Sequence, residues 1–292
     1  MEKLTNRRLY FDYNATSPLS PSVKRWLSEA EFSFANPSAI HLSGKKASAS
    51  LRESSEKILK VFNLSETHSI FFHSGASEGI NTIVKGISHS LDLKGEKLNF
   101  FYSSIDHAAV LELKSFLEFY GHNAYECNVD KNGHLDLISL EGKVKSCPPG
   151  TALINFTYVH NEIGTVFPLE KLDRLKDETG AFIHIDAVQA PGKVQFWDRL
   201  PSKVDFYTLS SHKFGGLKGV GLELFGTTES FLRFRSNPSL LDIRTDAFFV
   251  GSDKTQFISA SNGVIEISSS KFHLQPDGDV LMAGTIEAAD GK

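Results

Sequence analysis

Up to about residue 225, short apolar runs alternate with longer amphipathic segments. The apolar runs predict strands at residues 69–72, 97–101, 124–129, 152–156, 181–185, 204–209 and 220–225. The amphipathic segments predict helices at residues 21–34, 44–62, 78–88, 107–120, 135–144 and 169–178. This alternation is typical of a mostly parallel sheet that is covered by helices on both faces. The sequence therefore predicts an α/β fold.

The pattern changes after about residue 235, where the helical spacing disappears. Short apolar runs at 248–250, 256–258 and 264–267 are separated by turn dipeptides such as Asn262-Gly263 and Asp277-Gly278. We therefore predict a large domain at residues 1–235 and a short β-rich C-terminal segment at residues 236–292. The alternative for this segment is an extended, partly disordered tail.

Composition and charge narrow the class of protein. The chain has 292 residues, of which 40% are hydrophobic and 23% charged, as in a soluble globular protein. Its net charge of -4 argues against a nucleic-acid partner, because phosphate binding usually needs a basic surface. No segment approaches the roughly 18 consecutive apolar residues of a membrane helix, and no signal peptide is visible, so we expect a cytoplasmic protein without a membrane partner. We assign no metal ligands.

Lys213 is the first candidate for chemistry, because it closely follows the predicted strand at 204–209 and is flanked by small residues. Ligands of open α/β sheets bind at such strand ends. A lysine can form an imine with an aldehyde, but only its neutral amine attacks, so its usual pKa of about 10.4 must be lowered. The alternative is an ordinary solvated charge.

Asp186 follows the predicted strand at 181–185 and should lie at the same edge of the sheet. A carboxylate there can pair with a protonated pyridine nitrogen and keep the ring an electron sink. Nearby, Gln189 can donate a hydrogen bond to a phenolate oxygen of such a ring. The alternative for Asp186 is a helix cap or a turn residue.

Three further groups lie where predicted strands end. Small residues at Gly75, Ala76 and Ser77 allow backbone N–H groups and a helix N-terminus to close on a phosphate, although an ordinary turn also fits. His107 can stack on a planar ring or simply cap its helix, and Asn161 can donate a hydrogen bond to a ring oxygen. Because these groups meet at one edge of one sheet, they predict a single cofactor site.

Six motifs resemble those of cysteine desulfurases, pyridoxal-phosphate enzymes of fold type I in the class V aminotransferase group. They are Phe11-Asp12-Tyr13-Asn14-Ala15-Thr16, Asn36-Pro37-Ser38-Ala39-Ile40-His41, Ser74-Gly75-Ala76-Ser77-Glu78, His160-Asn161-Glu162-Ile163-Gly164, His184-Ile185-Asp186-Ala187-Val188-Gln189 and Ser210-Ser211-His212-Lys213. The resemblance covers residues 8–226 in unbroken order.

The resemblance implies that pyridoxal 5'-phosphate is the cofactor and that Lys213 forms the Schiff base with it. Asp186 would pair with the pyridine nitrogen and Gln189 with the ring oxygen, near Asn161, while His107 would stack on the ring as a catalytic residue. The phosphate would be held by a set of small and polar residues: Gly75, Ala76, Ser77, Ser210 and His212.

The resemblance also implies cleavage of the carbon–sulfur bond of L-cysteine or a related small amino acid. The products would be alanine and a persulfide on an enzyme cysteine, in sulfur metabolism and iron–sulfur cluster assembly. It further implies a homodimer and a sulfur-acceptor protein as partners.

Several positions depart from the resemblance. Ser77, His160 and Leu217 replace a usual threonine, a frequent asparagine and a frequent proline. More seriously, nothing after residue 225 matches the family's smaller domain, which carries the persulfide-forming cysteine and an arginine for the substrate carboxylate. The only cysteines are Cys127, in a predicted strand, and Cys147, so we expect an incomplete desulfurase.

Two alternatives stay open at this point. One is another lyase or aminotransferase of class V, which needs no persulfide cysteine. The other is a phage-associated structural or fusion protein with an inert enzyme-like domain, because residues 256–263, 265–270 and 272–279 resemble stretches of phage tail and virion proteins.

Overall fold

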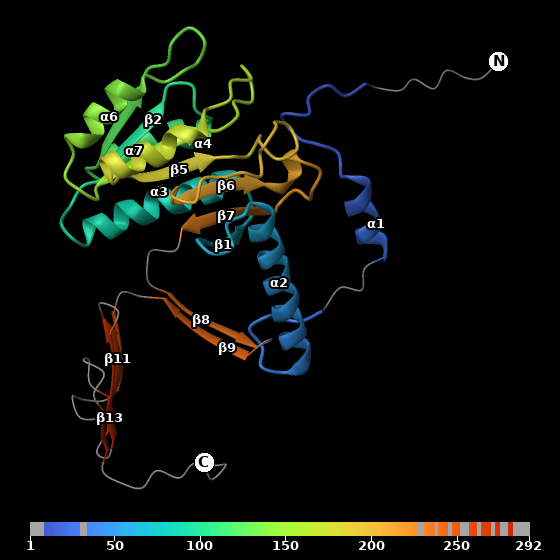
Figure 1. Cartoon of the computed structure of the whole chain (residues 1–292). Helices are drawn as coiled ribbons and strands as arrows, with labels where there is room; N and C mark the ends of the chain where they lie inside the picture. Colours follow the sequence, from blue (N-terminus) through green and yellow to red (C-terminus); the bar gives the residue numbers. More distant parts are fainter. Residues whose placement is uncertain are drawn as a thin grey trace. The chain divides into compact units, whose positions relative to one another are not determined.

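The computed structural model describes residues 9–29 and 34–226 and, beyond them, the backbones of seven strands between residues 231 and 282 (Figure 1). The chain forms two compact units, residues 1–226 and residues 227–292. The domain boundary predicted at residues 235 and 236 stays a prediction. No helix of the described residues is long and apolar enough to cross a membrane.

The first unit is built on a seven-stranded sheet in the order β1-β7-β6-β5-β4-β2-β3. Its strands are β1 (His68–His73), β2 (Asn99–Ser103), β3 (Asn123–Cys127), β4 (Ala152–Thr157), β5 (Phe182–Asp186), β6 (Phe206–Ser210) and β7 (Gly221–Gly226). The pairs β2–β3, β2–β4, β4–β5 and β5–β6 are parallel. The predicted α/β fold with a mostly parallel sheet is thereby confirmed.

Strand β7 is antiparallel to both β6 and β1. It follows β6 after only residues 211–220, which is too short for the crossover that a parallel neighbour requires. Because two reversals cancel, β1 runs in the same direction as β4, β5 and β6. The loop after β1 therefore lies at the same edge of the sheet as the loops that follow those three strands.

The helices lie between these strands in sequence. They are α1 (Pro21–Glu29), α2 (Leu42–Val61), α3 (Ala76–Asp92), α4 (Ala108–Leu111), α5 (Leu113–Phe119), α6 (Leu137–Lys145) and α7 (Leu172–Thr179), with short 3-10 helices η1 (Leu169–Lys171) and η2 (Ser211–Lys213). The helix predicted at 107–120 is two helices that meet at Glu112, and the one predicted at 169–178 begins as η1. In the helix predicted at 21–34, residues 30–33 lie outside the described residues.

Two apolar cores cover the two faces of the sheet. Phe100 packs with the buried residues of α3, α4 and α5, whereas its neighbour Phe101 packs with those of α2, α6 and α7. Successive residues of a strand point to opposite faces, so the near-continuous apolar runs of β2 and β4 serve both cores. Burial on both faces holds the strand ends in fixed positions.

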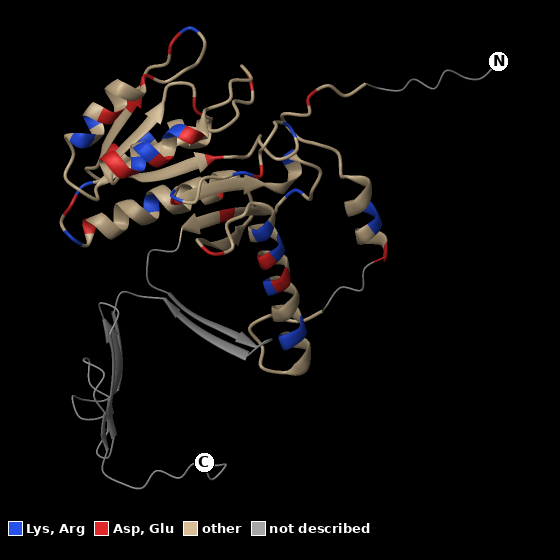
Figure 2. Cartoon of the chain, in the orientation of Figure 1, with Lys and Arg blue, Asp and Glu red and all other residues tan. Residues whose placement is uncertain are grey.

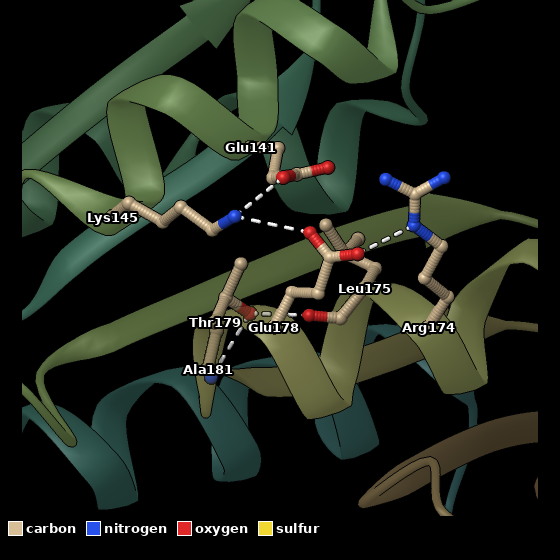
Figure 3. Close-up of polar contacts among 7 residues, drawn as sticks. All are labelled: Glu141, Lys145, Arg174, Leu175, Glu178, Thr179 and Ala181. Carbon is tan, nitrogen blue, oxygen red and sulfur yellow. Dashed lines mark hydrogen bonds and ion pairs between the residues drawn. The ribbon is translucent and has the colours of Figure 1, made fainter.

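Lys, Arg, Asp and Glu lie mostly on helices and loops (Figure 2). On α6 and α7 they form a small network, in which Glu178 accepts hydrogen bonds from Arg174 at 2.5 Å and Lys145 at 3.0 Å, and Lys145 also contacts Glu141 (Figure 3). These contacts, led by the one from Arg174, lower the pKa of Glu178 to about 2. Exposed ion pairs of this kind stabilise proteins little, so the helices are held mainly by their apolar faces.

The described strands of the second unit are antiparallel to their neighbours. β8 (Phe231–Ser236) pairs with β9 (Ser239–Arg244), and a separate sheet contains β10 (Ala247–Gly251), β11 (Phe257–Ser261), β12 (Val264–Ser269), β13 (Phe272–Leu274) and β14 (Val280–Met282) in sequence order. The apolar runs at 248–250 and 264–267 lie within β10 and β12, and residues 257–258 of the run at 256–258 lie within β11, as a β-rich segment requires. The turn at Asn262-Gly263 lies outside the described residues, and the resemblance to phage proteins stays a prediction.

Candidate active site

A pocket of about 880 Å³ opens at the carboxyl edge of β1, β4, β5 and β6. Its wall contains every site residue that the sequence predicts, namely Gly75, Ala76, Ser77, His107, Asn161, Asp186, Gln189, Ser210, His212 and Lys213. The sheet brings them together because these strands run in one direction. The N-terminal segment adds further residues to the wall, among them Asp12, Asn14 and Thr16.

Lys213 ends the short helix η2, immediately after β6. Its Nζ donates a hydrogen bond to the backbone carbonyl of Asn14 at 2.9 Å. Burial lowers the pKa of Lys213, while the carboxylates of Asp186 and Asp12 act in the opposite direction. A lowered pKa increases the fraction of neutral amine, which is the form that attacks a carbonyl carbon.

Asp186 is the last residue of β5 and is only 8% exposed. Its Oδ1 accepts a hydrogen bond from the Val188 N–H at 3.0 Å, so it does form the turn that the sequence allowed. Burial nevertheless raises the pKa of Asp186 to about 6, more than the Val188 N–H and the charges of His107 and Lys213 compensate. A buried carboxylate in this position is suited to a cationic partner in the pocket.

The loop between β1 and α3 presents the N-terminus of a 17-residue helix to the pocket. Gly75 is its N-cap and makes no side-chain cap hydrogen bond, and a Cβ at this position would have nothing within 4 Å. The Gly75 N–H itself donates to His73 Nδ1 at 3.2 Å. The N–H groups of Ala76 and Ser77 and the Ser77 hydroxyl therefore remain for an anion at the positive end of the helix.

His107 and His212 lie on two further loops of the pocket. His107 is the N-cap of α4, where its Nδ1 accepts from the Ala109 N–H at 3.1 Å. His212 Nδ1 lies 3.1 Å from the Thr16 hydroxyl. Burial and the neighbouring Lys213 lower the pKa of His212, which favours a neutral ring.

Sequence reasoning missed the central place of Asn14. Its backbone carbonyl accepts hydrogen bonds from Lys213 and from Gln189 Nε2 at 2.8 Å, and its side chain donates to the Asn161 carbonyl at 2.9 Å. Lys193, which was not predicted either, contacts the Gln189 side-chain oxygen. Asn14 lies within one of the six motifs, but contacts across 147 to 199 residues of sequence leave no local signal.

Neither cysteine lines the pocket. Cys127 is buried at the end of β3, and Cys147 lies just after α6. Burial raises the pKa of both thiols, which disfavours the nucleophilic thiolate. Both residues therefore lie in the scaffold, where the sequence analysis expected them.

Fold and site together define a class of protein, and comparison with known proteins agrees. The family "Aminotransferase class-V" matches residues 9–234, and the chain belongs to this family of pyridoxal-phosphate enzymes. More specifically, it is similar to cysteine desulfurases IscS: 37% identical to that of Dictyoglomus turgidum over 220 residues, 74% of this chain and 53% of the relative. Identity with IscS of Clostridium botulinum is 34% over 217 residues, again 74% and 53% of the two chains.

Solved structures give the same result. A "NIFS-LIKE PROTEIN" superposes with a TM-score of 0.65 and 32% identity, covering 75% of this chain and 59% of that one. "SspA in complex with cysteine" superposes with a TM-score of 0.62 and 31% identity, covering 74% and 60%. The chain thus spans about half the length of the curated relatives that it matches.

Proposed function

We propose that this chain binds pyridoxal phosphate in the pocket and acts on L-cysteine or a related small amino acid, as a cysteine desulfurase-like protein. One observation carries the proposal. A lysine with a lowered pKa, a buried carboxylate and a helix N-terminus with a glycine N-cap line the same pocket. These groups complement the aldehyde, the pyridinium nitrogen and the phosphate of that cofactor.

The pocket residues fit the cofactor in size and in chemistry. A volume of about 880 Å³ lies within the usual range of about 300–1,000 Å³ for cofactor sites. Asp186 would face the pyridine nitrogen, with His107 on the ring and Gln189 and Asn161 near its oxygen. Ala76, Ser77, Ser210 and His212 would surround the phosphate, with Gly75 giving it room. When bound, the cofactor supplies an electron sink for bonds at the substrate's α-carbon.

Cofactor attachment, proton transfer, orientation and exclusion of water would each be carried out by residues of this chain. Lys213 would hold the cofactor by a covalent bond and, once released by substrate, would move a proton at the substrate α-carbon. Asn14 would aim the Lys213 amine, because its carbonyl accepts from Nζ. Asp186 would keep the pyridine nitrogen protonated. Exclusion of water would fall to the N-terminal segment, which contributes Asp12, Asn14 and Thr16 to the pocket wall.

A second candidate function within the same family is supported by the position of the cysteines. Since neither Cys127 nor Cys147 lines the pocket, a persulfide cannot form at either without a large rearrangement. Reactions that need only Lys213 and Asp186, such as transfer of the amino group to the cofactor, do not depend on a thiolate. A class V lyase or aminotransferase activity is therefore a second candidate function, besides desulfuration.

The test is to add L-cysteine and a thiol reductant to the cofactor-loaded chain of 292 residues. We expect a change in cofactor absorbance but only trace alanine beside a full-length desulfurase, and no absorbance change in Lys213→Arg. Alanine production at a rate comparable to that of the full-length enzyme would contradict the expectation of only trace alanine. Cys127→Ser and Cys147→Ser would then identify the nucleophile, and other amino acids as substrates would separate the two functions.

We also propose that two copies of the chain associate and that a separate protein accepts any sulfur. Support for association comes from large apolar side chains exposed near the N-terminus, with Phe11 84% and Ile40 91% exposed. Association of two copies would remove such side chains from water. Light scattering should give the mass of a dimer, and Phe11→Ser should shift it towards the monomer.

A further inference from the structure

A row of buried polar side chains crosses the sheet directly beneath the pocket. It contains Asp106, Asn155, His184, Thr208 and Glu223, all at most 4% exposed. The last four lie on β4, β5, β6 and β7, the adjacent strands of the sheet. Side chains two apart on a strand share a face, so His184 lies one step below Asp186, and Thr208 one step below Ser210.

The protons in this row can be placed one by one, beginning at Asp106. The Asn155 Nδ2 donates to Asp106 Oδ2 at 2.8 Å, which turns the Asn155 Oδ1 towards His184 Nδ1 at 2.6 Å. His184 Nδ1 must therefore carry a proton. Burial lowers the pKa of His184 to about 3, so the ring is neutral and its Nε2 has a lone pair.

The lone pair on His184 Nε2 faces the Thr208 hydroxyl at 2.7 Å. Thr208 has a single hydroxyl proton, and the hydroxyl donates it to His184 Nε2. The same Thr208 oxygen lies 2.6 Å from Glu223 Oε2, a hydrogen-bond distance that now needs a proton from the glutamate. The only neutral arrangement that satisfies every contact in this order has a protonated Glu223.

Two other arrangements are disfavoured by the same contacts. Moving the proton to Asp106 is unfavourable because that carboxylate also accepts from the Ser103 N–H at 2.9 Å and the Thr157 hydroxyl at 2.6 Å. A charged His184 would be completely buried, and its Nε2 lies 3.8 Å from Glu223 Oε1, too far for a hydrogen bond.

We propose that Glu223 is a neutral carboxylic acid and a positioning residue, which donates a hydrogen bond to Thr208 and so fixes the strand ends that carry Asp186 and Ser210. It also keeps a second negative charge away from Asp186. The protonation of Glu223 is inferred from the contacts of the buried row alone, whereas its role in positioning Asp186 rests on the proposed function. Burial raises the pKa of Glu223 to about 8, while the contact with Thr208 acts in the opposite direction.

The groups that face Glu223 from neighbouring elements are His184 and Asp186 on β5 and His73 on β1. Asp186 raises the pKa of Glu223 by its charge. His73 Nε2 and Glu223 Oε1 are buried without a hydrogen-bond partner in the described part of the chain. Because His73 Nδ1 accepts from the Gly75 N–H, the proton of the neutral His73 ring is on Nε2. Burial lowers the pKa of His73, while the Leu222 carbonyl opposes this.

Infrared spectroscopy of the cofactor-free full chain tests the protonation. We expect the C=O band of a protonated carboxyl at neutral pH, which fades as pH rises through about 8. The band should be absent in Glu223→Gln and present in Asp106→Asn. Its absence from the unmodified chain, or its loss in Asp106→Asn alone, would overturn the proposal. If the variants fail to fold, ¹⁵N NMR of the unmodified chain decides: a proton on His184 Nδ1 alone supports the proposal, and one on Nε2 overturns it.

The positioning role of Glu223 is tested separately, by the affinity for pyridoxal phosphate and by the dependence of stability on pH. In Glu223→Gln the amide can donate to Thr208, so affinity for pyridoxal phosphate should match the unmodified chain. Glu223→Leu should weaken it several-fold, and equal affinity in both variants would overturn the role. Between pH 6 and about 8, above the window of Asp186, stability of the unmodified chain should fall as pH rises, since the folded state holds the extra proton of Glu223, and this part of the fall should vanish in Glu223→Gln. If the unmodified chain binds no cofactor, the proposed function fails, while the infrared result still decides the protonation of Glu223.

Discussion

At the scale of single residues, burial destabilises the ionised form of Asp186 as long as no cation lies beside it. Burial raises its pKa to about 6 from an ordinary value of 3.8. Between these two values the folded chain holds more protons than the unfolded chain, so stability without cofactor falls as pH rises through this window. A pyridinium beside Asp186 would reverse this, because an opposite charge favours the ionised carboxylate.

We therefore expect Asp186→Asn to weaken binding of pyridoxal phosphate about tenfold or more, since one pKa unit of charge preference is worth about 1.36 kcal/mol. Equilibrium dialysis measures the affinity. A matched control is Asp177→Asn, which removes a carboxylate that pairs with Lys203 outside the pocket. Equal affinity of Asp186→Asn and the unmodified chain would contradict the role of Asp186.

Residues such as Lys213 and Asp186 could be predicted from the sequence because each lies at or shortly after the end of an apolar strand, and parallel strands end at one edge. Asn14 could not be predicted in the same way, because its contacts join the N-terminal segment to loops far along the chain. The buried position of Glu223 could not be predicted from the sequence either, for another reason. A glutamate in an apolar run usually marks an exposed position, and the burial of Glu223 depends on its neighbours in the folded chain, α3 among them.

At the scale of elements, α3 approaches β1 and β7 closely at Gly79. A Cβ there would lie 2.6 Å from His73 Nε2 and 2.9 Å from Glu223 Oε2. These side chains cannot move aside freely, because His73 is bonded to the Gly75 N–H and Glu223 to Thr208. The glycine thus allows the helix N-terminus and the buried row to pack against each other.

Gly79→Ala should consequently destabilise the fold by about 1–3 kcal/mol through overpacking. Its control is Gly86→Ala in the same helix, where a Cβ would meet nothing within 4 Å and should stabilise by about 0.5–1 kcal/mol. Urea unfolding of both variants gives the comparison. Two changes of the same sign and size would contradict the close approach at Gly79.

The order of elements was predictable, since periodicity separates strands from helices over most of residues 9–226. The break between α4 and α5 at Glu112 was not, because apolar spacing continues through it at Val110, Leu113 and Leu117. The direction of β7 follows from the short loop before it and not from its own residues. That direction matters, because it returns β1, and with it the loop before α3, to the edge that carries Lys213.

At the scale of the whole molecule, the described pocket lies entirely within the first compact unit. Every residue of its wall precedes residue 226. A chain that ends at residue 235 should therefore bind pyridoxal phosphate with the affinity of the 292-residue chain. Spectroscopic titration of the two chains checks this, and loss of binding in a folded shorter chain would show that residues 236–292 contribute to the site.

The central claim is that Lys213 bonds the cofactor, and borohydride reduction tests it most directly. The chain is loaded with pyridoxal phosphate, reduced and mapped by peptide mass spectrometry. The account predicts the pyridoxyl label on Lys213, its loss in Lys213→Arg and its retention in Lys218→Arg, a control at a second lysine of the pocket wall. A label on Lys193 or Lys218 in the unmodified chain, or no label at all, would contradict it.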